Sequence, residues 1–525
     1  MSIKACYKLF AKSVLGWVIR PFKEDILFFS LVLIFLSLPW CCYYWGLGCI
    51  VYCGYVVAFY YVVSYMLTLL LNSWCVAAKF LRPLVLFVTS LFCVTNVYCV
   101  YTYNSLLSND FVQIIAGTNW KEAQEFASTV NGFLWVIAVI VIIVVLYVSN
   151  VRVSIGKWSI FPLFVLLSAC FAICRNSAVI SDAMCVKNGW TFRFDEIVDL
   201  RQHLTYPKLI STSETSPSNI VVILGESFSK SHSSLYGYKK ATNPLLQQRV
   251  IDGSLIVFQN VESPYTNTTK VFKYILNTNL KEHGDSLWYD KTSVIEVMNE
   301  VGYNTSWISN QAEKGMFDNL PSGHSKLCDF VCFIEENGCK ENYDGALVNI
   351  VPRTSSKQFV VYHLMGQHTL FRNRYPDSFS HFSAEDYLDS PANQRETLSQ
   401  YDNATLYNDF VVNSIIGKYQ KKNAVVFYFY DHALDIFESS PNYCGHARQT
   451  DKSIMNGKKI PFMIYVSPEF QKQNPEMVSQ IRNSTEKQYC TDKFIFTCMD
   501  ILGYRFADND DVEKYSILSI KETQQ

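Results

Sequence analysis

Several apolar runs in the second part of this chain are followed by side chains that can bind a metal ion or attack a phosphorus atom. These side chains are Glu226, Ser227, Thr268, His368, Asp431, His432 and His446. Carboxylate and imidazole groups are suitable ligands for Zn²⁺, and a catalytic zinc keeps one position open for substrate. A metal ion also lowers the pKa of a bound hydroxyl group and makes it a nucleophile. A single Asp-His pair or loop histidine is more often structural, but their joint occurrence predicts a metal-dependent site.

The apolar runs predict the strands that would position these side chains. Ile220–Leu224 is short, uninterrupted and mostly β-branched, which is typical of a strand buried on both faces. Further runs of this kind are Leu255–Val261, Asn304–Ile308, Gln358–Leu364, Asn423–Tyr430 and Ile460–Val466. They alternate with helix-compatible segments, including Ser293–Val301 and Glu396–Tyr419. This alternation predicts an α/β domain with a mainly parallel sheet.

In such a sheet, ligands bind just beyond the carboxyl ends of the strands. Glu226 and Ser227 follow the first buried strand at this position, so we expect them to face a ligand. The alternative is a simple strand-to-helix turn in which Ser227 caps the following helix. The other strand-end residues favour the ligand site over the turn.

The first third of the chain has the composition of membrane-spanning helices. A helix that crosses a bilayer needs about 20 mostly apolar residues. The segments that meet this requirement are Ile26–Tyr44, Gly48–Leu71, Pro83–Tyr103, Gly132–Ser149 and Trp158–Cys174. We therefore predict a multi-domain protein. A transmembrane helical domain of about five spans occupies residues 1–175, a bridging segment residues 176–216, and a metal-dependent catalytic α/β domain residues 217–525.

The basic residues between the spans predict the orientation, because Lys and Arg are enriched in cytoplasmic loops. With five spans, one side of the membrane contains Lys4, Lys8, Lys12, Arg20, Lys23, Lys79, Arg82, Arg152 and Lys157. The connections between spans on the opposite side contain only one basic residue, Lys121. The amino terminus is therefore predicted to be cytoplasmic, and everything after Cys174 is predicted to lie outside.

Charge and cysteine content narrow the class of protein further. The formal net charge is -1, so the chain lacks the basic surface of a nucleic-acid-binding protein. Of the 17 cysteines, Cys328, Cys332 and Cys339 lie close together, and a disulfide there would fit an oxidising compartment. The chain has no Cys-x-x-Cys pair, so a thiolate zinc site is not expected.

A series of short motifs follows one another in a fixed order along the chain. They are Gly225-Glu-Ser227, Leu235-Tyr-Gly-Tyr238, Thr242-Asn-Pro244, Ser263-Pro-Tyr-Thr-Asn-Thr268, Trp307-Ile-Ser-Asn-Gln311, His363-Leu-Met-Gly-Gln-His368, Tyr401-Asp-Asn403, Tyr407-Asn-Asp409, Tyr430-Asp-His432 and Cys444-Gly-His446. With the five spans, this order resembles the inner-membrane phosphoethanolamine transferases of the alkaline phosphatase/sulfatase superfamily. The resemblance covers nearly the whole chain.

The resemblance implies a role for each candidate residue. The implied ligands of a catalytic Zn²⁺ are Glu226, Thr268, Asp431 and His432. Thr268 would also be the nucleophile that accepts phosphoethanolamine. The implied contacts to the transferred group or to a second metal are His368, His446 and Lys314. One zinc ion is expected, a second is an option, and Mn²⁺ is the less favoured metal.

The implied reaction transfers phosphoethanolamine from phosphatidylethanolamine to a cell-envelope glycolipid or glycan. Lipid A or lipopolysaccharide is the favoured acceptor. A zinc-activated Thr268 would form a covalent phospho-threonine intermediate, which divides one difficult displacement into two easier steps. The protein would be a monomeric, multi-pass protein of the bacterial inner membrane with its catalytic domain in the periplasm.

Some departures from the family leave alternatives open. Ser227 and Ala433 stand where Thr and Gly are common, and the loop around Pro264 lacks the disulfide of well-known members. One alternative is a phosphoglycerol transferase of the lipoteichoic-acid-synthase type. Another is a membrane-tethered sulfatase or phosphatase, although the C/S-x-P-x-R motif of sulfatases is absent. A transporter or receptor is disfavoured because the predicted spans contain no ionisable Asp, Glu, Lys or Arg.

Overall fold

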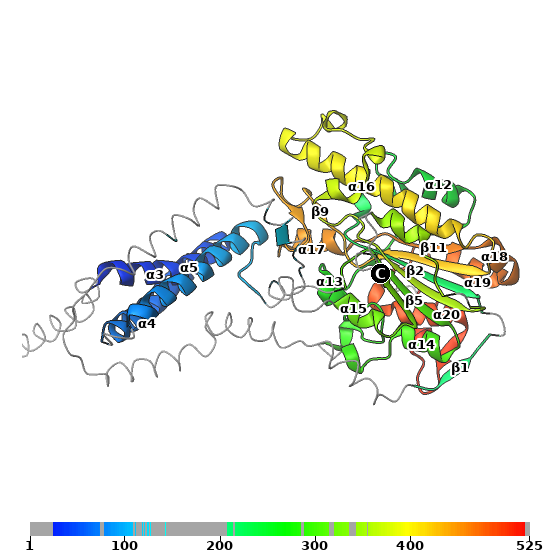
Figure 1. Cartoon of the computed structure of the whole chain (residues 1–525), viewed down its shortest axis with the longest axis horizontal. Helices are drawn as coiled ribbons and strands as arrows, with labels where there is room; N and C mark the ends of the chain where they lie inside the picture. The colour runs from blue at the N-terminus through cyan, green and yellow to red at the C-terminus, as the bar shows by residue number, and fades with distance from the viewer. Residues whose placement is uncertain are drawn as a thin grey trace, which may run out of the picture. The chain divides into compact units, whose positions relative to one another are not determined.

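The computed structural model describes residues 25–73, 78–108, 207–213, 216–284, 288–313, 320–334, 343–353 and 355–519, with a few positions between 111 and 142. The chain divides into two compact units, which are described separately. Figure 1 shows the helices of the first unit and the sheet of the second.

The first unit contains three helices that are long and apolar enough to cross a membrane, counted over its described residues. They are α3 (Ile26–Gly46), α4 (Ile50–Ser73) and α5 (Ala78–Tyr103). These helices confirm the first three predicted spans. The predicted spans Gly132–Ser149 and Trp158–Cys174 lie outside the described residues, so they stay predictions.

A buried ion pair joins two of these helices. Arg82 lies inside the third candidate span, Phe80–Tyr103, and its Nη1 is 2.6 Å from Oδ2 of Asp25. Asp25 also accepts a hydrogen bond from the backbone N–H of Phe28 and so caps α3. The expectation that no ionisable residue lies inside the spans is therefore wrong for α5. The span begins at Phe80, before the predicted start at Pro83, and it therefore includes Arg82, which is paired with Asp25.

The second unit is built on a sheet of seven described strands in the order β3-β11-β8-β2-β7-β5-β6. They are β2 (Asn219–Gly225), β3 (Leu255–Phe258), β5 (Asn304–Ser309), β6 (Phe330–Phe333), β7 (Gln358–His363), β8 (Ala424–Tyr430) and β11 (Phe462–Val466). All pairs are parallel except the two that β11 forms. The six predicted strands and the mainly parallel sheet are confirmed. The edge strand β6 was missed because it is short and only half buried.

Helices cover this sheet on both faces (Figure 1). The main ones are α12 (Pro244–Ile251), α14 (Val294–Glu300), α16 (Ala392–Gly417), α17 (Asp451–Lys458), α19 (Pro475–Arg482) and α20 (Phe494–Leu502). Side chains of β8 alternate between the two helix layers, as side chains of a strand must. The Tyr430 hydroxyl donates to Asn408 of α16, at 2.8 Å, whereas the ring of Phe429 packs on Phe494 of α20. The predicted helices Ser293–Val301 and Glu396–Tyr419 correspond to α14 and α16.

Shorter elements complete the unit. The short helices are α13 (Thr268–Val271), α15 (Leu320–Ser325), α18 (Pro468–Gln473) and α21 (Asp511–Tyr515). The two-stranded pairs are β1 (Leu209–Ser211) with β13 (Tyr504–Phe506), β9 (Asp435–Ile436) with β10 (Cys444–Gly445), and β4 (Val261–Glu262) with β12 (Tyr489–Cys490). Free thiols occur at Cys328, Cys444, Cys490 and Cys498. Cys339 lies outside the described residues, so a disulfide in its cluster stays a prediction.

The central strand β2 lies between β8 and β7, and the register of these pairs positions the site. Gly225 lies opposite Tyr430, and Leu224 lies opposite His363. The residues that follow these strands therefore leave the sheet side by side. Only glycine fits at position 225, because a Cβ there would lie 2.1 Å from a ring carbon of Tyr430.

We expect the Gly225→Ala substitution to destabilise the second unit. The added methyl group would overlap the buried Tyr430 ring, and overpacking of this kind costs about 1–3 kcal/mol. The measurement is the thermal unfolding midpoint of the detergent-purified protein, which should fall by several degrees. Gly417→Ala at the end of α16 is the matched control, because no atom lies within 4 Å of its new methyl group. Equal midpoints for the two variants would contradict the close approach of β2 and β8.

Candidate metal centre

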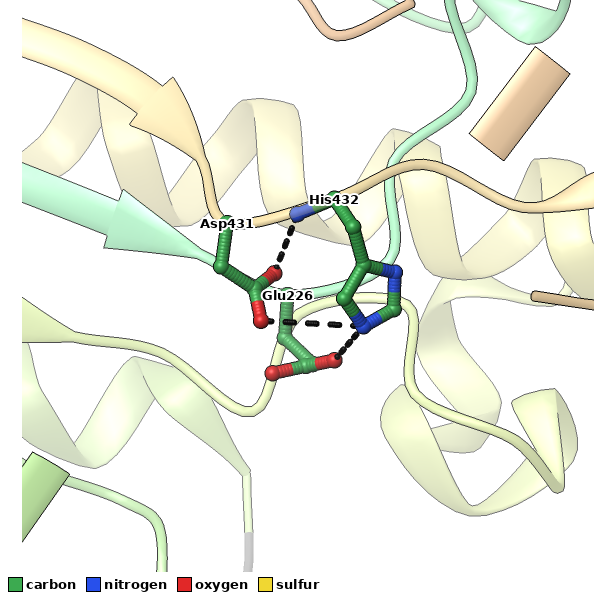
Figure 2. A group of neighbouring side chains, drawn as sticks. All are labelled: Glu226, Asp431 and His432. Carbon is green, nitrogen blue, oxygen red and sulfur yellow. Dashed lines mark hydrogen bonds and ion pairs between the residues drawn. The ribbon is translucent and has the colours of Figure 1, made fainter. Parts of the chain in front are cut away.

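Three buried side chains converge beyond the carboxyl ends of β2 and β8 (Figure 2). Glu226 follows β2, whereas Asp431 and His432 follow β8. One ligand atom from each lies within 4.8 Å of the other two. Nε2 of His432 is 2.9 Å from Oε1 of Glu226 and 3.6 Å from Oδ2 of Asp431. The structure thus brings together the three residues that the sequence predicts as metal ligands.

Thr268 completes the predicted set. It is the first residue of α13, where Asn267 caps the helix by accepting a hydrogen bond from the Lys270 N–H at 2.8 Å. Oγ1 of Thr268 lies 3.3 Å and 3.4 Å from the two carboxylate oxygens of Glu226, and 3.4 Å from Nε2 of His432. The hydroxyl is half-buried, so it is held against two of the three buried ligands and remains partly accessible.

The structure describes two of the three residues that were predicted to contact the transferred group or a second metal. The ring of His446 lies 4.3 Å from the ring of His432, and its Nδ1 is 2.7 Å from the carbonyl oxygen of Thr266. Since a carbonyl only accepts, Nδ1 of His446 donates and Nε2 keeps a free lone pair. His368 is close enough for its charge to act on Glu226. Lys314 lies outside the described residues.

Neighbouring polar side chains hold the Glu226 carboxylate and the Asp431 backbone in place. Ser227 Oγ donates to Oε1 of Glu226 at 3.0 Å, so it does not act as the helix cap of the alternative interpretation. Gln311 Nε2 donates to Oε2 of Glu226 at 3.4 Å and to the Leu364 carbonyl at 2.9 Å. Ser263 donates its hydroxyl to the carbonyl oxygen of Asp431. All three residues lie in quoted motifs, but the partners of Gln311 and Ser263 are 80 or more positions away, so the sequence did not indicate these contacts.

The loop after β7 packs directly against the backbone of Glu226. Gly366 has a φ of +55°, and a Cβ at this position would lie 2.6 Å from the Glu226 carbonyl oxygen. The Gln367 N–H donates to that same oxygen at 2.9 Å. The buried carboxylate of Asp344 accepts hydrogen bonds from the backbone N–H groups of Met365 and Gly366, each at 2.8 Å. The loop is therefore fixed on both sides.

Tyr401 of α16 fixes the chain that follows Glu226. Its hydroxyl donates to the carbonyl oxygen of Ser227 at 2.8 Å and accepts from the Ser229 N–H at 2.7 Å. Ser227 has a φ of +65°, a region that non-glycine residues rarely adopt and that needs support from its surroundings. Tyr401 is completely buried, so its two hydrogen bonds are protected from water.

The charges of Glu226, Asp431 and His432 shift one another's pKa values when no cation is bound. Burial opposes ionisation of Glu226, but the charge of His432 outweighs it and holds the pKa of Glu226 well below its usual range. Burial and then the Glu226 charge raise the pKa of Asp431. Burial disfavours the charged form of His432, yet Asp431 and Glu226 together raise its pKa to about 9. Burial lowers the pKa of His446 to about 3, so that imidazole is neutral.

The residues fit a metal ion by three criteria. Asp431 Oδ2 is buried and has no hydrogen-bond donor among the described residues, so a cation would satisfy it. Nδ1 of His432 lies 3.0 Å from the Ala433 carbonyl and donates to it, which leaves Nε2 as the ligand atom. Nε2 of His432 lies 2.9 to 3.6 Å from the nearest oxygens of Glu226, Thr268 and Asp431, and these separations bracket the value of about 3.3 Å expected between ligands of a tetrahedral zinc.

Comparisons with known proteins agree with this fold and site. The sulfatase family model matches residues 218–504, more than half of the chain. Phosphoethanolamine transferase EptC of Escherichia coli (strain K12) is 26% identical over 339 residues, 62% of this chain and 58% of that protein. Phosphoethanolamine transferase CptA of Salmonella typhimurium (strain LT2) is 28% identical over 324 residues, 59% of this chain and 55% of that protein. The matches thus span less than two thirds of these relatives.

Solved structures agree as well. The zinc complex of the C-terminal periplasmic domain of Escherichia coli EptC is 26% identical and has a TM-score of 0.55, covering 61% of this chain and 92% of that one. The integral membrane lipooligosaccharide phosphoethanolamine transferase A of Neisseria meningitidis has a TM-score of 0.71 over 94% of this chain and 98% of that one. It is only 16% identical, so it shows the fold alone.

The sheet and the acidic and imidazole ligands at its carboxyl edge define an α/β domain of the sulfatase/alkaline-phosphatase class. The chain belongs to the sulfatase family. The resemblance to phosphoethanolamine transferases that the motifs indicated is also confirmed, because the curated relatives EptC and CptA carry that name.

Zinc binding is expected to strengthen as the pH rises toward about 9. Zinc must displace the proton from Nε2 of His432, whose pKa is about 9 in the metal-free protein. Below this pKa, each rise of one pH unit should therefore strengthen zinc binding up to about tenfold. The measurement is the apparent dissociation constant by competition with a chelator at a series of pH values.

His432→Gln should flatten this pH profile as well as weaken binding. The exposed His283 is the matched control, and His283→Gln should leave the profile unchanged. A native protein whose zinc affinity is the same at pH 6 and pH 8 would show that His432 is not the protonated ligand.

Tyr401→Phe is expected to weaken zinc binding about tenfold. It removes the hydroxyl that holds both Ser227 and Ser229, and the net loss of such hydrogen bonds costs about 1–1.5 kcal/mol. Tyr419→Phe is the matched control, because that buried hydroxyl pairs with Tyr362 at 3.2 Å instead. Thermal stability should fall in both variants, whereas zinc affinity should fall only in Tyr401→Phe. Equal affinities would mean that Tyr401 only stabilises the fold.

Proposed function

We propose that this chain transfers phosphoethanolamine from phosphatidylethanolamine to a cell-envelope glycolipid, with lipid A or lipopolysaccharide as the favoured acceptor. The observation that carries the proposal is the position of Oγ1 of Thr268, 3.3 to 3.4 Å from both carboxylate oxygens of Glu226 and from Nε2 of His432. A hydroxyl held against two metal-type ligands is suited to nucleophilic attack on phosphorus. The names of the curated relatives support the transferred group.

Zinc is the metal that the donor set favours, and the zinc complex of the EptC domain supports this choice. The residues that would hold it are Glu226, Thr268, Asp431 and His432. When bound, zinc supplies charge that lowers the pKa of the Thr268 hydroxyl and offsets charge on the phosphoryl oxygens. The ion would also compensate Asp431 Oδ2, which has no hydrogen-bond donor among the described protein groups.

The reaction proceeds in two displacements at Thr268. In the first, Oγ1 forms a bond to the phosphorus of the donor, the bond from phosphorus to the diacylglycerol oxygen breaks, and that oxygen leaves with a proton. In the second, an acceptor oxygen forms the new bond to phosphorus, and Oγ1 leaves and regains a proton. The carboxylate of Glu226 faces Oγ1 throughout and can accept its hydrogen bond. The neutral His446 and the nearby His368 are suited to contact the transferred group.

The proposed arrangement in the membrane places this chemistry beside both lipid substrates. Five spans within residues 1–175 would leave the amino terminus in the cytoplasm and residues 217–525 in the periplasm, joined by the bridge 176–216. The three described helices of suitable length and hydropathy support this arrangement. The whole would be a monomeric protein of the bacterial inner membrane.

Thr268 is expected to carry a phosphoethanolamine adduct in protein purified from membranes rich in phosphatidylethanolamine. The measurement is mass spectrometry of the peptide that contains it. Thr269→Ala is the matched control, because it removes the neighbouring hydroxyl and should keep the adduct. Thr268→Ala should lose both the adduct and more than about 10³-fold of the transfer rate, as expected when a covalent nucleophile is removed.

Two outcomes would contradict the proposal. A phosphoglycerol adduct on Thr268 would move the protein to the lipoteichoic-acid-synthase type of transferase. Full transfer activity in Thr268→Ala would refute the covalent mechanism.

A further inference from the structure

A cluster of three lysines surrounds the loop that leads to Thr268, and nothing in the reaction at the metal centre uses it. Nζ of Lys281 lies 4.9 Å from the centre of the Tyr265 ring, and Nζ of Lys270 lies 5.3 Å from the centre of the same ring. Lys458 is the third member, and its side chain contacts that of Lys281. We call Lys270, Lys281 and Lys458 the lysine cluster.

Two of these ammonium groups, those of Lys281 and Lys458, face each other, and the charge of Glu262 offsets the effect of Lys281 on Lys458 only in part. Burial and then the neighbouring Lys281 lower the pKa of Lys458, as expected for adjacent like charges. Among the described residues, Nζ of Lys281 donates to the carbonyl oxygen of Pro264 at 3.0 Å, and no carboxylate forms an ion pair with Lys281 or Lys458. Asp492 lies nearby, but it accepts from the backbone N–H of Lys281. An ammonium group has three donors, so Lys281 keeps two for a ligand.

The cluster and the metal centre share one loop. Ser263 donates to the carbonyl of Asp431 and its N–H donates to the Lys458 carbonyl at 2.8 Å. Pro264 accepts from Lys281, and four residues later, three after Tyr265, the same loop reaches Thr268. Three residues span at most about 11 Å, so Tyr265 cannot lie further than this from Thr268. A substrate that reaches Thr268 can therefore also reach the cluster.

We propose that the lysine cluster binds a phosphate group carried by the acceptor. This inference rests on the proposed transfer of phosphoethanolamine, and it narrows the acceptor class to phosphorylated glycolipids and excludes neutral glycans. The donor does not fit the cluster, because its single phosphate must contact Oγ1 of Thr268 and its free end is an ammonium group that lysines repel. A phosphate with several oxygens fits adjacent ammonium groups, since charge-assisted hydrogen bonds of this kind are short and strong.

The test separates donor loading, acceptor binding and transfer in the full-length protein in nanodiscs. The variant is Lys281→Gln combined with Lys458→Gln. Its matched control is Lys452→Gln combined with Lys421→Gln, which removes two exposed lysines elsewhere. Loading is measured as the mass-spectrometric adduct on Thr268, with phosphatidylethanolamine as the donor. Binding and transfer are then measured with bisphosphorylated lipid A and with the same lipid after removal of its phosphates.

The cluster variant should load Thr268 as the native protein does. Its binding of bisphosphorylated lipid A, and its transfer to that lipid, should both fall about 10- to 100-fold, as expected for the loss of two charge-assisted contacts. The control variant should match the native protein in every assay. The native protein should bind the dephosphorylated lipid as weakly as the cluster variant does.

Several results would overturn the inference without touching the proposed function. Loss of Thr268 loading in the cluster variant would assign the cluster to the donor. Equal binding of both lipid A forms by the native protein would show that the protein does not recognise the phosphate groups. An equal loss of phosphatidylglycerol binding in the cluster variant would make the cluster a general contact for anionic lipids. Absence of the adduct from the native protein would instead refute the proposed function, while the binding assay still decides whether the cluster recognises phosphate.

Discussion

The candidate metal centre of the second unit depends on two carboxylates, Glu226 and Asp431, that are buried side by side. Removing ionised carboxylates from water is costly unless a cation or hydrogen-bond donors compensate. His432 compensates in part, because its imidazolium contacts both groups and its pKa is raised to about 9. One oxygen of Asp431 still has no donor among the described residues. The remaining deficit makes the position suited to a cation, and Thr268 lies beside it.

The surrounding structure prevents the carboxylates from moving apart to relieve this cost. The register of β2 with β8 brings both ligand-bearing backbones to the same edge of the sheet, and Gly225 allows them to approach. Gly366 allows the loop after β7 to pack on the Glu226 backbone, and the buried Tyr401 holds the strained turn at Ser227. These contacts come from elements far apart in the sequence, so the site is rigid only when the whole sheet is assembled.

This explains how far the sequence could predict the structure. The strands were predictable because each is a continuous apolar run, and Glu226, Asp431 and His432 were predictable because they follow such runs directly. The supports were not predictable in the same way. Tyr401 and Ser227 are separated by 174 positions, and nothing local signals that a buried tyrosine of a helix will hold a turn after a strand. The edge strand β6 was missed because an apolar run of four residues is too short to distinguish a strand from other short apolar segments.

The loop from Ser263 to Thr268 joins the two charged parts of the site. At one end, Ser263 holds the backbone of Asp431, and Pro264 accepts a hydrogen bond from Lys281. At the other end, Thr268 faces Glu226. Negative charge gathers at the buried ligands, whereas positive charge gathers around Tyr265. A cation on the first side and an anion on the second would each lower the electrostatic cost of the loop conformation, so binding at either side should favour binding at the other.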